Sequence, residues 1–183
     1  MRLRSSVSPL CLVLLTGCPT TPTTTPPPSD DGAIEEPSTP IIPAEPANHT
    51  EGDELEATIP VIGGDSIELS SLRGRPVLLE ISASWEPGFA EAHALYAELL
   101  AEHGELAVIV VVADPEDAGL SGLPPEFTLA WDPAGALAAK FSVATFPTMF
   151  VIDRGGRISA VVNGWDAGVH DALRESVARA SSS

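Results

Sequence analysis

Two carboxylates, Glu80 and Glu86, lie close together in the sequence at a point where an apolar run ends and a helix is expected to begin. Glu80 interrupts the run RPVLLEIS, and because burial disfavours the charged form of a carboxylate, an acid in such a run is a candidate functional group. Glu86 follows Trp85, and a carboxylate at a helix N-terminus is stabilised by about 0.3 to 1 kcal/mol. The two acids could therefore act as a pair. The alternative is structural, with Glu86 as a first-turn residue and Phe89 as a packing residue.

Metal binding and serine chemistry are disfavoured by the spacing of the other polar residues. Glu86 and His93 are seven positions apart, which separates their backbones by about 10.5 Å along a helix, whereas the atoms that bind a metal lie about 2 Å from it. The remaining histidines, His49, His103 and His170, show no ligand spacing and are expected at the surface or at helix caps. Neither Ser82 nor Ser84 lies in a nucleophile-elbow motif. We expect no metal and no cofactor.

The composition excludes nucleic acid as a partner. The 183-residue chain carries a formal net charge of −17 and has a pI near 4.3, whereas phosphate binding needs clustered Lys and Arg. The two cysteines, Cys11 and Cys18, both lie near the N-terminus, so residues 19–183 contain no thiol. The oligomeric state is not indicated by the sequence.

The N-terminal residues 1–17 are expected to be a lipoprotein signal peptide. Arg2 and Arg4 precede the short apolar run PLCLVLL, which is typical of a secretory signal and too short to span a bilayer. The following LTGC resembles the bacterial lipobox, which implies that Cys18 is acylated and anchors the chain to a membrane. Pro19 rather than Asp follows Cys18. The resemblance then implies a location in the bacterial cell envelope, at the outer membrane, facing the periplasm or the exterior.

Residues 18–54 are predicted to be the lipidated Cys18 and an acidic linker. The segment is rich in Pro and Thr and contains no Lys or Arg. With few large apolar residues it is expected to be extended and disordered. Such a tether would hold a folded domain away from a membrane.

The pattern from residue 55 to residue 180 predicts one α/β domain. ATIPVI and SIEL flank the turn signal GGD and predict an N-terminal hairpin, while RPVLLEIS and LAVIVVVAD read as strands buried on both faces. A helix is expected between these two strands, over 87–104, with Pro87 in its first turn. A short strand FTLAW, a helix PAGALAAKF, two strands joined at Arg154-Gly155-Gly156 and a closing helix DAGVHDALRESVARA follow. The result is a mixed central sheet with helices on both faces.

Three segments of this domain together resemble the thioredoxin-like thiol-disulfide oxidoreductases, or redoxins, of the bacterial envelope. They are LSSLRGRPVLLEISASW, WDPAGALAAKFSV and ATFPTMFVIDRGGRI. The resemblance implies a thioredoxin-like fold over nearly the whole domain.

The resemblance also assigns positions to the site. Trp85 matches the Trp that precedes the Cys-x-x-Cys pair of the family, so Glu86 stands at the nucleophile position and Phe89 at the resolving position. Pro147 matches the family's cis-proline, which shapes a groove for an extended partner chain. Glu80 matches the buried acid beneath the dithiol, and is then either a relic or the partner of Glu86.

Two readings of function follow from this resemblance. In the first, the domain is redox-inactive, is not an enzyme, and binds an extended peptide or an envelope protein beside Trp85 and Pro147. In the second, it is an enzyme of oxidoreductase ancestry that uses its own carboxylates or a partner's thiol. A peroxidase label by homology would describe ancestry only, because peroxide-reducing relatives also need a cysteine. Thiol-disulfide exchange itself requires a thiolate, and the domain has none.

Overall fold

A computed structural model describes residues 49–114, 120 and 122–183. The predicted signal peptide, the acylated Cys18 and the linker up to residue 48 lie outside the described residues. Residues just before Leu55 already pair with the domain. The Gly52 N–H donates to the Ile158 carbonyl (2.8 Å), and Glu54 forms an isolated β-bridge with Arg157. Among the described residues, no helix combines the length and the apolar character needed to cross a membrane.

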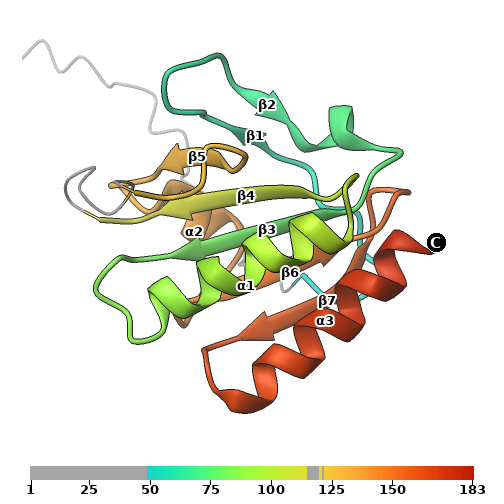
Figure 1. Cartoon of the computed structure of the whole chain (residues 1–183). Helices are drawn as coiled ribbons and strands as arrows, with labels where there is room; N and C mark the ends of the chain where they lie inside the picture. Colours follow the sequence, from blue (N-terminus) through green and yellow to red (C-terminus); the bar gives the residue numbers. More distant parts are fainter. Residues whose placement is uncertain (1–48, 115–119, 121) are drawn as a thin grey trace, which may run out of the picture. The chain divides into compact units, whose positions relative to one another are not determined.

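The centre of the domain is a five-stranded mixed sheet with the order β5-β4-β3-β6-β7 (Figure 1). Strands β3, β4 and β5 are parallel, whereas β6 is antiparallel to both β3 and β7. Their bounds are β3 Val77–Ser82, β4 Ala107–Val112, β5 Thr128–Trp131, β6 Thr148–Ile152 and β7 Ile158–Asn163. The predicted mixed sheet is confirmed.

Helices cover both faces of this sheet (Figure 1). Helix α1, Phe89–Glu102, and helix α3, Ala167–Ser181, lie on one face, and the short helix α2, Ala136–Lys140, lies on the other. The N-terminal hairpin of β1, Thr58–Ile59, and β2, Ile67–Glu68, is followed by a 3-10 turn, η1, Leu69–Leu72. The predicted hairpin and the predicted β-α-β unit of β3, α1 and β4 are therefore present.

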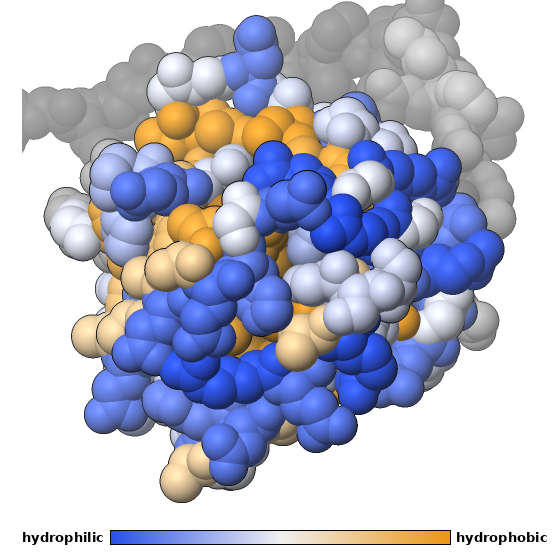
Figure 2. All heavy atoms as spheres, turned by 45° about the vertical axis from the view of Figure 1, so that its right-hand side comes forward, coloured by the Kyte–Doolittle hydropathy of each residue, from blue (hydrophilic) through white to orange (hydrophobic). Residues whose placement is uncertain are grey.

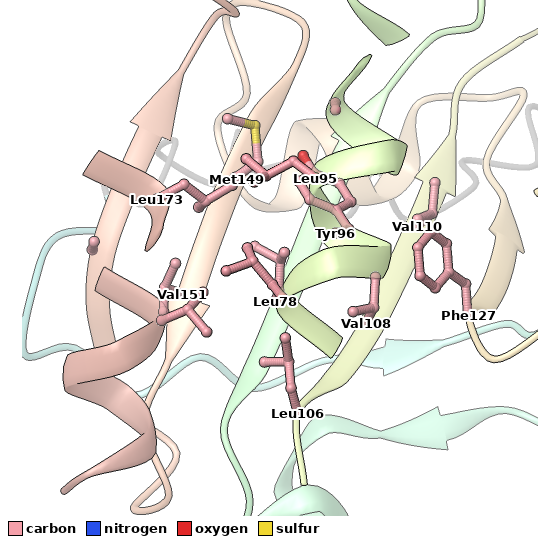
Figure 3. Close-up of a cluster of buried hydrophobic side chains, with 14 of the residues drawn as sticks. Leu78, Leu95, Tyr96, Leu106, Val108, Val110, Phe127, Met149, Val151 and Leu173 are labelled. Carbon is pink, nitrogen blue, oxygen red and sulfur yellow. The ribbon is translucent and has the colours of Figure 1, made fainter. Parts of the chain in front are cut away.

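The alternation of β3 side chains divides the core into two layers. Leu78 and Glu80 face α1 and α3, whereas Leu79 and Ile81 face α2 and the hairpin, because successive side chains of a strand point to opposite faces. The first layer contains Tyr96, and Figure 3 shows it among aliphatic side chains of the sheet and of both helices. Glu80 is thus a carboxylate inside an apolar layer.

Helix α1 begins later than the sequence predicts. Pro87, expected in the first turn, lies outside the helix, and Gly88 precedes it with φ of +88°. A residue with this backbone conformation cannot continue a right-handed helix, so the helix begins at Phe89. For the same reason α2 begins at Ala136, after Gly135 with φ of +66°, rather than at Pro133. The closing helix α3 lies where it was predicted, with Asp166 as its N-cap accepting from two backbone N–H groups.

Candidate functional site

The predicted site residues gather at one edge of the sheet. The parallel strands β3, β4 and β5 end at this edge, β6 begins there and β7 returns to it, because Ile81 pairs with Thr148 and Thr148 pairs with Asn163. We call this the site edge and define it by Trp85, Asp114, Trp131, Pro147 and Trp165. The three tryptophans of the chain all lie here: one after β3, one at the end of β5 and one after β7.

Asp114 holds the segment that leaves β3. Its carboxylate accepts from the Ser84 hydroxyl (2.5 Å) and from the Ser84 backbone N–H (2.9 Å). Its backbone carbonyl accepts from the Trp131 indole N–H at 2.8 Å. Asp114 is 6% exposed, so this small network fixes the start of the turn. Among the hydrogen bonds of the described residues, the Ser84 hydroxyl has the Asp114 carboxylate as its partner and no histidine.

Trp85 projects from this turn and is the most exposed large hydrophobic residue described, at 58%. Glu86 is half-buried, its N–H donates to the Ala83 carbonyl (3.1 Å), and its own carbonyl accepts from Phe89 N–H (3.2 Å). Glu86 therefore lies in a turn before the helix and not in the first turn of α1. The side chain of Glu86 takes part in none of the hydrogen bonds or ion pairs described.

Phe89 packs into the core layer beneath the site edge. It is partly buried against that layer, and its ring meets the His93 imidazole edge-on, with ring centroids 4.2 Å apart and planes at 88°. The packing interpretation of Phe89 is therefore confirmed. The ring covers His93, one turn further along α1.

Glu80 is paired with His93, not with Glu86. His93 Nε2 lies 2.7 Å from Glu80 Oε2, and the two side chains are 4% and 0% exposed. None of the described hydrogen bonds joins Glu80 to Glu86. Sequence reasoning tested His93 as a metal ligand and missed this contact. The signal was available, since an acid in a buried strand needs a partner and the apolar face of the neighbouring helix offered one histidine.

Several polar atoms in and beside this buried pair have no hydrogen bond of ordinary geometry. Within the described residues they are Glu80 Oε1, Ser82 Oγ, His93 Nδ1 and the Tyr96 hydroxyl, although Tyr96 lies near enough to Glu80 for that acid to affect its pKa. Burial raises the pKa of the Tyr96 hydroxyl well above its ordinary value of 10.0, and the charge of the nearby Glu80 raises it further. The site is thus underlain by a cluster of polar groups that solvent does not reach.

Pro147 directly precedes β6, whose first residue, Thr148, pairs with Ile81 near the end of β3. The Phe146–Pro147 peptide bond is cis, as the sequence predicted. The Thr148 hydroxyl donates to the Thr145 carbonyl at 2.7 Å, and it also lies 2.9 Å from Asn163 Oδ1 of β7. These contacts hold the loop before β6 against the site edge.

Trp165 lies directly on the turn before α1. A Cβ atom placed on Gly88 would lie 2.1 Å from Trp165 Cδ1, so this close approach requires glycine. The Trp165 indole N–H donates to Glu91 (3.3 Å), and its ring lies 4.9 Å from that of His170. A pocket of about 580 Å³ opens here, lined by residues that include Pro87, Gly88, Glu91, Trp165, Asp166 and His170. Sequence reasoning missed Trp165, whose only signal was its position after the last strand.

The other histidines take ordinary structural places. His103 is the C-cap residue of α1, as expected, and His49 packs edge-on against Phe141. Within the described part of the chain, no group of three or more His, Cys, Asp or Glu side chains is arranged to hold a metal ion.

A family model described as AhpC/TSA family matches residues 52–161, which is more than half of the chain. The chain belongs to the AhpC/TSA family. None of the curated proteins matches this sequence.

Solved structures similar to this AhpC/TSA chain have the thioredoxin-like fold. One is a protein assigned as thiol:disulfide interchange protein DsbE from Chlorobium tepidum, with 26% identity over 73% of this chain and 99% of that one and a TM-score of 0.67. Others are the exposed lipoprotein thioredoxin Etrx1 of Streptococcus pneumoniae (22% identity, 68% and 99% covered, TM-score 0.56) and the peroxidoxin BcpB of Mycobacterium tuberculosis (22%, 73% and 98%, 0.58). The expected thioredoxin-like fold is therefore confirmed.

Proposed function

We propose that this AhpC/TSA-family domain binds an extended peptide or protein segment at the site edge and does not catalyse thiol-disulfide exchange. The observation that carries the proposal is the substitution of both thiol positions on a retained scaffold. Glu86 and Phe89 stand where the family places its cysteines, while Trp85 and the cis Pro147 remain in place beside them.

The chemistry of the family cannot be carried by the domain's own residues. Exchange proceeds by attack of a thiolate on a disulfide sulfur through a mixed disulfide. The two cysteines of the chain, Cys11 and Cys18, precede the domain, and Cys18 is the residue that the lipobox resemblance assigns to acylation. A carboxylate at position 86 keeps a negative charge without this reactivity.

The contacts of Glu80 argue against the alternative of an enzyme that acts on a partner's thiol. To take a proton from such a thiol, Glu80 would need an accessible oxygen. One of its oxygens instead contacts His93, the side chain is fully buried, and Phe89 covers His93. The acid therefore faces a side chain of its own domain and not the surface.

The site edge has the features of a binding surface. Tryptophan is enriched at the energetic centres of protein interfaces, and here Trp85 is 58% and Trp131 36% exposed. Ala144 and Thr145, in the loop before Pro147, are exposed as well. An extended segment lying along this edge would contact Trp85 and the loop together.

We further propose that Cys18 anchors the chain to a membrane of a bacterial envelope and that the Pro- and Thr-rich segment after it is a tether. The leader pattern and the lipobox support this placement. One of the structural neighbours is itself described as an exposed lipoprotein thioredoxin.

The experiment that tests the proposed function combines a binding assay with a redox assay. The purified chain is expected to bind unstructured peptides and to leave protein disulfides at the background rate, and Trp85→Ala is expected to weaken binding without unfolding the domain. Glu56→Gln, at an exposed position in the N-terminal part of the domain, is the control for the effect of an unrelated surface substitution. Disulfide reduction or oxidation above background by the unaltered chain would refute redox inactivity, and the absence of any peptide binding would refute the binding role.

A further inference from the structure

The basic side chains of the domain lie mostly away from the site edge. Six of the seven described Lys and Arg residues lie away from the site edge, before β3, in the β6–β7 turn or in the second half of α3: Arg73, Arg75, Arg154, Arg157, Arg174 and Arg179. The seventh is Lys140 at the end of α2. Figure 2, in which the end of the domain with the start of β3 comes forward, shows strongly hydrophilic residues over most of that face.

The arginines that lie away from the site edge already have partners. Arg73 and Arg157 pair with Glu54 at 3.2 and 2.9 Å, and Arg154 pairs with Glu105 at 2.5 Å. Arg174 contacts Glu98 and Glu102, Arg179 lies 3.6 Å from Glu175, and Arg75 donates to two backbone carbonyls. Their charge is therefore largely balanced locally.

The site edge carries acids without such balance. Glu86, Glu91 and Asp166 line or adjoin the turn before α1 and the start of α3, and no ion pair is described for any of them. Glu91 and Asp166 lie at the N-termini of α1 and α3, where they offset the positive ends of the helix dipoles. Glu86, three residues before α1, adds a further negative charge. A surface of one sign attracts partners of the other sign.

The pocket beside Gly88 offers the features that a basic side chain needs. One wall is the Trp165 indole, and cations bind over the face of Trp more strongly than over other aromatic rings. The Glu91 carboxylate lies against the same indole at 3.3 Å, and the volume of about 580 Å³ exceeds that of a single long side chain. The pocket adjoins the turn that carries Trp85.

We infer that this pocket takes a Lys or Arg side chain of the extended segment that binds at the site edge. The inference rests on the proposed function and names the class of partner: a basic protein segment. The chain's own linker is the wrong occupant, because it contains Glu35, Glu36 and Glu45 and no Lys or Arg. Acidic ligands in general would be repelled by the carboxylates at the site edge.

The test compares three fluorescent peptides of equal length and extended character that differ only in one central residue pair: Arg-Lys, Gln-Gln or Glu-Glu. Binding to the full chain is measured by anisotropy at several salt concentrations. The basic peptide is expected to bind roughly tenfold more tightly than the neutral one, and this advantage is expected to shrink as salt rises. Glu86→Gln with Glu91→Gln is expected to remove most of the advantage, because Gln keeps the acceptor for the Trp165 indole and loses the charge.

The control Glu56→Gln removes the same charge from an exposed position outside the pocket and is expected to keep the preference for the basic peptide. Equal affinity for the three peptides, with binding still lost in Trp85→Ala, would overturn the inference and leave the proposed function standing. Preference for the basic peptide that is unchanged in the double Gln variant would also overturn it, since the attraction would then be general. Binding of none of the peptides would refute both.

Discussion

Glu80 of β3 and His93 of α1 form a buried contact of 2.7 Å, and the ring of Phe89 packs edge-on against the His93 imidazole. Removing one partner of such a pair leaves the other buried without a partner, and this typically costs about 3 to 5 kcal/mol of stability, whereas replacing both by apolar residues is often neutral. We expect His93→Leu to lower the free energy of unfolding by roughly 3 kcal/mol and Glu80→Leu with His93→Leu to restore most of it. Urea unfolding of His93→Leu, Glu80→Leu and the double variant measures the free energy that couples the two side chains. Additive losses would show that the pair is not coupled.

The close approach of Trp165 to Gly88 predicts an unusually costly glycine substitution. In Gly88→Ala the new Cβ would lie 2.1 Å from the Trp165 indole, and the alanine would have to adopt a φ of +88°. Gly52→Ala is the matched control, because Gly52 has φ of +92° and no atom within 4 Å of the added Cβ. The control is expected to lose about 1 to 2 kcal/mol from backbone strain, and Gly88→Ala distinctly more, by thermal or urea unfolding. Equal losses would mean that the indole moves aside freely.

Alkaline pH is expected to destabilise the domain through Tyr96. Its folded-state pKa is raised above the unfolded value near 10, so the phenol ionises first in the unfolded chain. Its contribution to stability is complete below pH 10 and is lost as the pH rises from there toward the folded-state pKa. We expect the difference in stability between the natural chain and Tyr96→Phe to shift in favour of the variant above pH 10. A difference that is constant between pH 8 and pH 11 would contradict the burial of this hydroxyl.

Introducing two cysteines tests the proposal that residues 86 and 89 stand at the thiol positions of the family. Glu86→Cys with Phe89→Cys is expected to give a chain that reduces protein disulfides measurably above the unaltered chain, because Trp85 and the cis Pro147 are already in place. The single Cys variants are the controls, since they cannot close an intramolecular disulfide. A folded double variant without activity would show that the two thiols are not sufficient, and would point to the buried Glu80–His93 pair as what prevents the reaction.

The strands and helices of the domain could be predicted because their signals are local. Continuous apolar runs gave β3 and β4, and the Gly-rich turn gave the β6–β7 hairpin. The start of α1 was predicted too early, because Pro87 is a good first-turn residue in isolation, whereas the chain at Gly88 has a positive φ and lies tightly against Trp165, a residue far away in the sequence. Local patterns do not contain such a contact.

The candidate site was predictable in position and incomplete in its contacts. Trp85, Glu86, Phe89 and Pro147 lie at one end of the sheet because of the order of the strands, and their assignment to the family's site stays a prediction. The partner of Glu80 was not foreseen, because two acids near one strand end suggested each other. The strand register determines the partner instead. Glu80 points into the layer under α1, where His93 lies, whereas Glu86 lies in the turn before α1 and has no hydrogen bond with Glu80 among the described residues.

The placement of all three tryptophans at the site edge has a spectroscopic consequence. The indole emission of this protein originates at one end of the molecule, from rings that differ in exposure and in hydrogen bonding. Any ligand that settles there should alter the intensity or the wavelength of that emission without an added label, while events at the arginine-rich end should leave it unchanged. The domain therefore carries a built-in optical probe of the surface whose partner is sought.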